Sequence, residues 1–119
     1  MSNRIGLALI LMVFLFGCAQ QSKLYYFGNY SQTLYKSEKN RTEESINLHK
    51  QELEKIIASS KEKNLTIPPG IYAELGYLSL KENKTDIAIE LFAKESEIYP
   101  ESKYLMDRLI QKAQSQKNM

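Results

Sequence analysis

The chain has 119 residues, with 16 basic and 14 acidic side chains and a formal net charge of +2. This length leaves room for one small domain, and the near-balanced charge argues against a nucleic-acid-binding protein. The single cysteine, Cys18, excludes an intramolecular disulfide.

The N-terminal residues form a hydrophobic run that ends near this cysteine. Arg4 precedes an apolar stretch from Ile5 to Phe16 that only Gly6 interrupts. The run is shorter than the roughly 20 residues that cross a hydrocarbon core, and it has the length typical of a signal peptide. A secretory signal with an incidental cysteine and a retained membrane anchor are the alternatives to a lipoprotein signal.

The stretch Leu15-Phe16-Gly17-Cys18 resembles the lipobox of bacterial lipoproteins. The resemblance implies that residues 1–17 are a signal peptide that is removed, and that Cys18 carries diacylglycerol and an N-terminal acyl chain such as palmitate. Ala19 replaces the aspartate that retains many lipoproteins at the inner membrane. The resemblance therefore implies the outer membrane and its periplasmic face, where two or three acyl chains give stable attachment.

Residues 18–41 are expected to hold the lipidated cysteine, a polar spacer and an aromatic segment. Gly28-Asn29 predicts a turn, and a short helix is expected over 31–39 with Leu34 and Tyr35 facing inward. The aromatic side chains of this segment are compatible with three roles, namely core packing, contact with a protein partner or contact with the bilayer. The residues concerned are Tyr25, Tyr26, Phe27 and Tyr30.

Residues 42–119 are predicted to form a helical domain. Helices are expected over 42–63, 69–82, 85–99 and 101–114, followed by a frayed tail. Thr42 is expected to cap the first helix, and Pro100 is expected to separate the last two. An apolar stripe in the first helix contains Ile46, His49, Leu53, Ile56 and Ile57. The fold class is therefore all-α, with four or five helices.

Residues 69–102 resemble one tetratricopeptide repeat. Gly76 and Ala88 are expected where its two antiparallel helices approach most closely, and Ser79 and Glu95 depart from the family pattern. A generic helical hairpin is the alternative. One repeat cannot bury its hydrophobic faces alone, so neighbouring helices are expected on both sides. The matching residues are Tyr72, Leu75, Gly76, Ala88, Phe92 and Pro100.

Three stretches, YYFGNYSQTLY, PPGIYAELGYLSL and YPES, are together similar to a family of small Gram-negative lipoproteins classed as a domain of unknown function. The resemblance covers nearly everything after Cys18. It implies an envelope complex with a curli-secretion-channel-like lipoprotein. It implies no enzymatic activity and assigns no functional residue.

The sequence offers little catalytic chemistry. His49 is the only histidine and is interpreted as a structural residue. The spacing of His, Cys, Asp and Glu predicts no metal site, and the twelve glutamates are predicted to lie on solvated helix faces. We therefore expect neither a cofactor nor an enzyme.

Two asparagines lie in extended glycosylation sequons. Asn40 follows Glu38 and Asn64 follows Glu62, which gives the pattern E-x-N-x-T twice. The pattern resembles the acceptor of bacterial N-glycosylation systems, and chance in a Glu- and Asn-rich sequence is the alternative.

The sequence thus predicts an outer-membrane-anchored lipoprotein that acts as a non-catalytic protein–protein interaction or assembly module. Its partner is expected to be an envelope protein. The alternative is a self-associating structural lipoprotein without a client.

Overall fold

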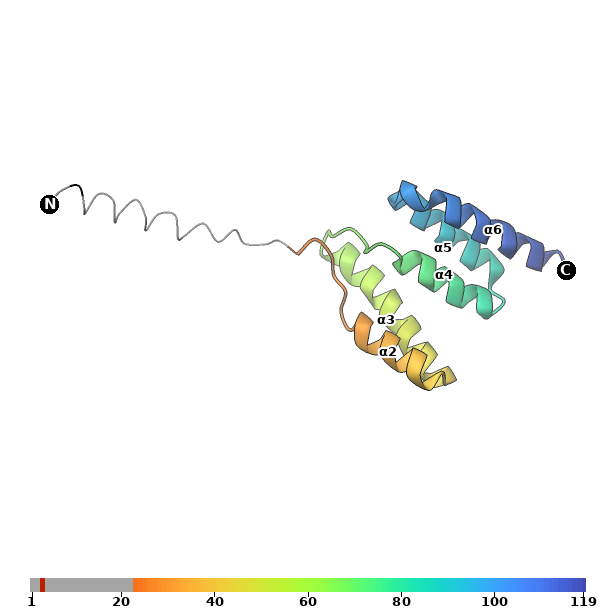
Figure 1. Ribbon diagram of the computed structural model, residues 1–119, viewed down its shortest axis with the longest axis horizontal. Coiled ribbons are helices and arrows are strands. Elements are labelled where there is room, and N and C mark those ends of the chain that lie inside the picture. The colour runs from red at the N-terminus through yellow and green to blue at the C-terminus, as the bar shows by residue number, and fades with distance from the viewer. Residues whose placement is uncertain (1–2, 4–22) are drawn as a thin grey trace.

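The computed structural model describes residue 3 and residues 23–119, and within this part the chain is helical without strands. The helices, labelled as in Figure 1, are α2 (Tyr30–Asn40), α3 (Glu43–Glu62), α4 (Ile71–Lys81), α5 (Thr85–Ile98) and α6 (Lys103–Lys117), with the short 3₁₀ helix η1 (Pro100–Ser102) before α6. The prediction of a small all-α domain is confirmed.

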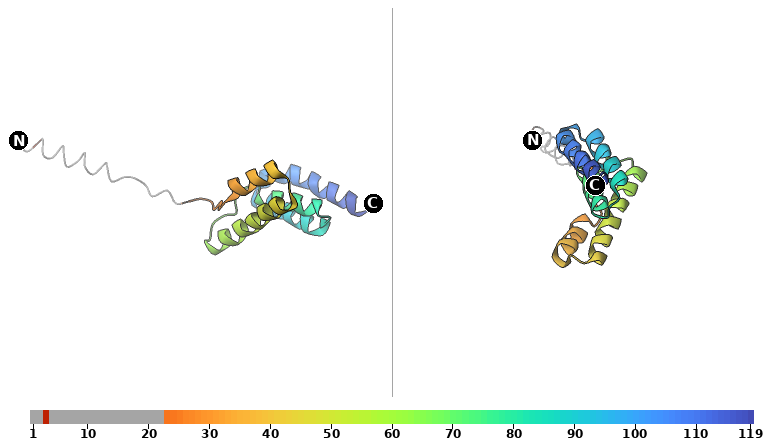
Figure 2. Two further views of the ribbon diagram at one scale, coloured as in Figure 1. Left: turned by 90° about the horizontal axis from the view of Figure 1, so that it is seen from below. Right: turned by 90° about the vertical axis from the view of Figure 1, so that its right-hand side faces the viewer.

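The helices follow one another through space in chain order. α2 and α3 form one antiparallel pair, α3 packs on α4, and α4, α5 and α6 lie side by side (Figures 1 and 2). The helical body therefore begins before residue 42, because α2 packs directly on α3. Among the described residues, none of the helices combines the length and the apolar character needed to cross a membrane.

Local sequence explains where α3 and α4 begin. Thr42 caps α3 as predicted, since its Oγ1 accepts from the Ser45 amide at 3.2 Å while the Ser45 Oγ accepts from the Thr42 amide at 3.2 Å. α4 begins two residues after the predicted Pro69. Gly70 has φ +89°, and the Ile71 amide bonds the Pro68 carbonyl at 3.3 Å. These values describe a type II turn with proline second and glycine third, so Pro69 belongs to the turn.

The close approach of α4 and α5 depends on a glycine. A Cβ atom added to Gly76 would lie 2.8 Å from Cε1 of Phe92 and 3.3 Å from the carbonyl oxygen of Ala88. Ala88 and Phe92 are fully buried. The structure therefore brings together Gly76, Ala88 and Phe92, as the predicted repeat requires, while Pro100 lies exposed at the first position of η1.

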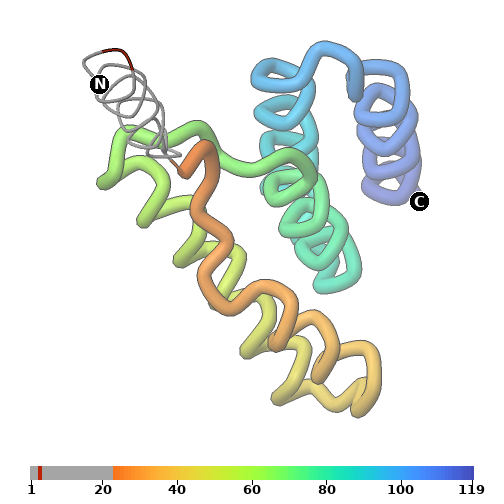
Figure 3. Tube along the Cα trace, turned by 60° about the vertical axis from the view of Figure 1, so that its left-hand side comes forward, coloured from red at the N-terminus to blue at the C-terminus, as the bar shows by residue number. Residues whose placement is uncertain are grey.

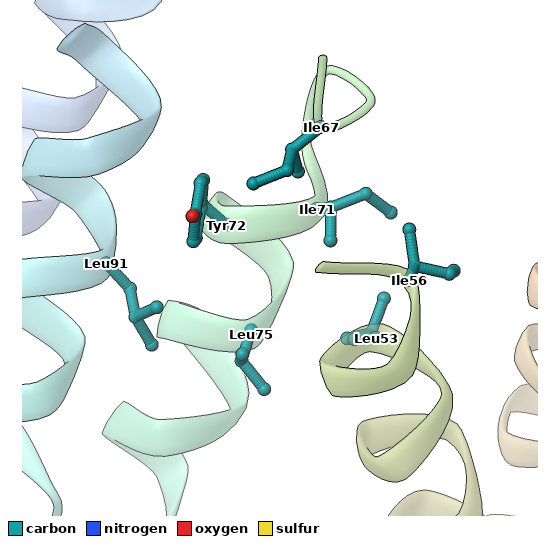
Figure 4. Packing of buried hydrophobic residues seen from close by; sticks show 7 residues of the cluster. All are labelled: Leu53, Ile56, Ile67, Ile71, Tyr72, Leu75 and Leu91. Carbon is teal, nitrogen blue, oxygen red and sulfur yellow. The ribbon is translucent and has the colours of Figure 1, made fainter. Parts of the chain in front are cut away.

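Two hydrophobic clusters hold the helices together. The first lies between α3, the 63–70 loop, α4 and α5 (Figure 4). The second lies between α4, α5 and α6. The buried members of the first are Leu53, Ile56, Ile67, Ile71, Tyr72, Leu75 and Leu91, and those of the second are Leu80, Ala88, Phe92, Met106 and Ala113.

Two local expectations were wrong. Tyr35 does not face inward but is 63% exposed, with Lys39 one turn away and its Nζ 5.5 Å from the ring centre. The expected frayed tail is helical as far as Lys117. Lys117 forms an ion pair with Asp86 of α5 at 2.7 Å, and no Gly or Pro interrupts the helix before this contact.

Candidate functional site

The aromatic segment folds back against α3 and divides into inward and outward side chains. Tyr26 and Tyr30 pack against the first hydrophobic cluster. Phe27 is 47% exposed, and its ring makes edge contacts with Tyr25 at 6.1 Å and Tyr30 at 6.3 Å between centroids. Tyr26 and Tyr30 therefore contribute to core packing, whereas Phe27 presents its ring to the surface.

The turn at Gly28 fixes the path of this segment. Gly28 has φ +48°, and a Cβ atom there would lie 2.3 Å from Oε1 of Glu52. The same oxygen accepts from the Asn29 amide at 2.8 Å. Glu52 is buried, so the sequence prediction that all glutamates lie on solvated faces was wrong here. Its carboxylate is compensated by the amide at the start of α2.

A polar network joins α2, α3 and α4. The Nε2 atom of His49 lies 2.6 Å from Oε1 of Glu74, and its Nδ1 atom lies 2.8 Å from Oγ1 of Thr33. Tyr30 donates its hydroxyl proton to Oε2 of Glu74 at 2.8 Å. Because a carboxylate only accepts, Nε2 of His49 carries a proton and donates it to Glu74.

A hydroxyl, an imidazole and a carboxylate in series are also the groups of a nucleophilic triad. His49 is only 2% exposed, however, and the Thr33 hydroxyl lies 3.1 Å from the carbonyl oxygen of Tyr30 in its own helix. We interpret the series as a link that fixes the positions of three helices. Burial, together with the bond to Glu74, raises the pKa of Tyr30 to about 12, which keeps the phenol protonated as a donor.

A groove of about 500 Å³ opens beside this network, between α2 and α4 and above α3. Leu34 of α2 and Arg41, the residue after α2, line one side of it, and Tyr77 and Lys81 of α4 line the other. Nζ of Lys81 lies 4.6 Å from the centre of the Tyr77 ring, and Tyr77 is about half exposed. The groove therefore presents apolar and aromatic surface next to charges of both signs.

Glu95 is a further buried carboxylate that the sequence did not reveal as a contact residue. It is 3% exposed and accepts from the amides of Gly70 at 2.7 Å and Ala73 at 3.4 Å. Amides at the start of a helix have no acceptor within the helix, and a negative charge is favoured there. The carboxylate of Glu95 supplies the acceptor for these two amides at the start of α4. The only signal in the sequence was that Glu95 departs from the repeat pattern.

The sequence also did not reveal Thr33 and Glu74 as partners of His49. They lie 16 and 25 residues from it in the chain. No spacing rule for one helix connects such positions. Burial of His49 agrees with the interpretation of a structural histidine. Across residues 23–119, the structure brings together no group of three His, Cys, Asp or Glu side chains that could hold a metal ion.

The remaining predicted positions lie apart from the groove. Asn40 is the last residue of α2, and Asn64 follows α3 with φ +53°. Both are exposed, so both sequons are sterically accessible. Cys18 lies outside the described residues.

A profile of the family described as "Domain of unknown function (DUF4810)" matches residues 24–109. The match covers most of the chain, which therefore belongs to this family. It also spans α2 together with the later helices, in agreement with their packing in one body. No curated protein and no solved structure matches the chain significantly.

Proposed function

We propose that the protein is a lipoprotein whose helical domain serves as a non-catalytic interaction or assembly module on the periplasmic face of the outer membrane. The lipobox-like stretch Leu15–Cys18 and Ala19 support the anchor and its location. Lipid on Cys18 confines the domain to the membrane surface, which raises its effective concentration near partners on that surface.

The domain is tetratricopeptide-like in this proposal. The six pattern residues of 69–102 and the tight contact at Gly76 support this assignment. A single repeat needs neighbours to cover its faces, and α3 and α6 pack on its two sides.

The observation that carries the interaction role is the open groove between α2 and α4. It combines an exposed aromatic ring, Tyr77, with the charges of Arg41, Glu38 and Lys81. Aromatic residues contribute much of the energy of protein interfaces, and surrounding charges select the partner. On the family resemblance, the partner is an envelope protein such as a curli-secretion-channel-like lipoprotein.

The test is in vivo crosslinking of the tagged protein followed by mass spectrometry. Tyr77→Ala removes the exposed ring from the groove, and Tyr35→Ala removes an exposed ring of α2 that does not line it. We expect an outer-membrane partner that is lost with Tyr77→Ala and retained with Tyr35→Ala. Equal recovery with both variants contradicts the groove as the binding site.

Self-association is the second candidate function. α6 is the last helix of the array, and its Tyr104 and Leu105 side chains are largely exposed. A second copy packed on this helix produces a dimer without a client. Sedimentation over a range of concentrations separates the two candidates, because a concentration-independent monomer contradicts self-association.

A further inference from the structure

Three segments that are distant in the sequence meet at one end of the molecule. They are residues 23–26, the 63–70 loop and residues 98–105, which lie toward the top of Figure 3. Residues 27–28 lead from this end to the middle of α3, where Gly28 lies against Glu52. The Tyr99 hydroxyl donates to the Ile67 carbonyl at 2.7 Å, and Nζ of Lys63 lies 5.4 Å from the centre of the Tyr26 ring. We call this end the proximal end, because the chain enters the helical body here.

The proximal end carries exposed apolar side chains next to lysines. Leu24 is 68% exposed and Phe27 is 47% exposed. Lys23 and Lys63 are exposed in the same segments, and Tyr104 and Leu105 add apolar surface at the start of α6. Aromatic and aliphatic side chains flanked by lysines are typical of surfaces that rest in the interface of a phospholipid bilayer.

Chain length places this surface near the lipid anchor. Leu24 is the sixth residue after Cys18, and a chain extends by at most about 3.6 Å per residue. The Cα atoms of the two residues are therefore within about 22 Å of each other in any conformation. The opposite end of α3, at Asn40 and Arg41, lies about 30 Å from Lys63, since α3 has 20 residues. It lies about 16 Å from the start of α2, which follows Phe27, since α2 has 11 residues.

We propose that the proximal end docks on the phospholipid surface, with Leu24 and Phe27 in the bilayer interface and Lys23 and Lys63 beside lipid phosphates. This inference rests on the anchor at Cys18 in the proposed function. Docking fixes the orientation of α3 relative to the membrane. It places the α2–α3 turn away from the bilayer and covers the sequon at Asn64, while Asn40 stays accessible.

The test uses the full-length protein, purified in detergent and reconstituted into vesicles of phosphatidylethanolamine and phosphatidylglycerol. Single nitroxide labels are attached to Leu24→Cys, Phe27→Cys and, as the distal control, Asn40→Cys. Power saturation compares collisions of each label with oxygen, which concentrates in the bilayer, and with a water-soluble nickel complex. Circular dichroism checks that each labelled variant is folded.

We expect the labels at 24 and 27 to be several-fold better shielded from nickel than the label at 40, with a matching gain in oxygen contact. Equal nickel access at all three positions overturns the inference. A second result also overturns the inference. If the labels at 24 and 27 are accessible to nickel in these vesicles but shielded in native envelope membranes, a protein and not the lipid covers the proximal end.

The protein without an added cysteine separates this inference from the proposed function. Its Cys18 sulfur takes no nitroxide if it carries lipid. Labelling at Cys18 contradicts the anchor and, with it, the docking. An unlabelled Cys18 together with aqueous positions 24 and 27 contradicts the docking alone.

Discussion

Three glutamates connect segments that are far apart in the sequence. Glu52 accepts from the Asn29 amide, Glu95 accepts from the Gly70 amide, and Glu74 accepts from Tyr30, 44 residues away. Burying a carboxylate is costly unless donors compensate it. Each of these carboxylates has a donor from another element, so each specifies how two elements meet as well as adding stability.

At the residue scale, the raised pKa of Tyr30 predicts that the folded protein loses stability at alkaline pH. Its pKa is about 12 in the folded protein because of burial and the bond to Glu74, whereas an unperturbed tyrosine has a pKa of 10. Above pH 10 the unfolded chain loses this proton and the folded chain keeps it. The contribution of Tyr30 is thus complete below pH 10 and is lost between pH 10 and 12. Urea unfolding across this range measures the decline.

Tyr30→Phe is the control for this pH dependence, because it removes the titrating group and keeps the ring. We expect the variant to be less stable at neutral pH, by about 1–2 kcal/mol for a lost hydrogen bond to a charged acceptor. Its stability then falls less steeply than that of the wild type above pH 10. Identical slopes for both proteins contradict the assigned role of Tyr30.

At the scale of the elements, helix boundaries follow from local chemistry and were largely predictable. Thr42 forms the expected cap of α3, and the Pro69-Gly70 turn separates α3 from α4. Gly76 was predicted to be a close-approach position because residues 69–102 resemble a tetratricopeptide repeat. Such signals lie within a few residues of the feature that they determine.

Contacts between elements were not predictable in the same way. Glu52 and Glu95 have the composition of solvated helix positions, and only the neighbouring element supplies the amides that make their burial favourable. The Thr33–His49–Glu74 series likewise requires three helices to be in place. Tyr35 was predicted to face inward, but in the structure its side chain is 63% exposed.

The contacts of Glu95 with the amides of Gly70 and Ala73 predict that this side chain stabilises the start of α4. We expect Glu95→Ala to destabilise the protein by about 2–4 kcal/mol, because it leaves the amides at the start of α4 without their charged acceptor in a buried site. Glu97→Ala is the matched control, since Glu97 is exposed on the same helix and should change stability by less than about 0.5 kcal/mol. Urea unfolding compares the two variants. Equal losses contradict the capping role.

At the scale of the whole molecule, α4 connects the two hydrophobic clusters. Ile71, Tyr72 and Leu75 belong to the first cluster, while Leu80 belongs to the second. α5 is shared in the same way, through Leu91 and Phe92. A helical array can unfold piecewise when contacts exist only between neighbours. The main helix contacts in this protein are also between neighbours in the chain, but α4 and α5 each contribute buried residues to both clusters. This sharing makes each cluster depend on the other.

This coupling predicts one cooperative unfolding transition for residues 23–119. Leu53→Ala in the first cluster and Met106→Ala in the second each create a cavity in a fully buried position, with an expected cost of about 2–5 kcal/mol. Residue-resolved hydrogen exchange in α3 and in α5 measures whether each loss spreads. If the clusters are coupled through α4, both variants lower protection in both helices equally. A loss from Met106→Ala that stays within α5 and α6 shows instead that the second cluster opens independently, which contradicts a single cooperative unit.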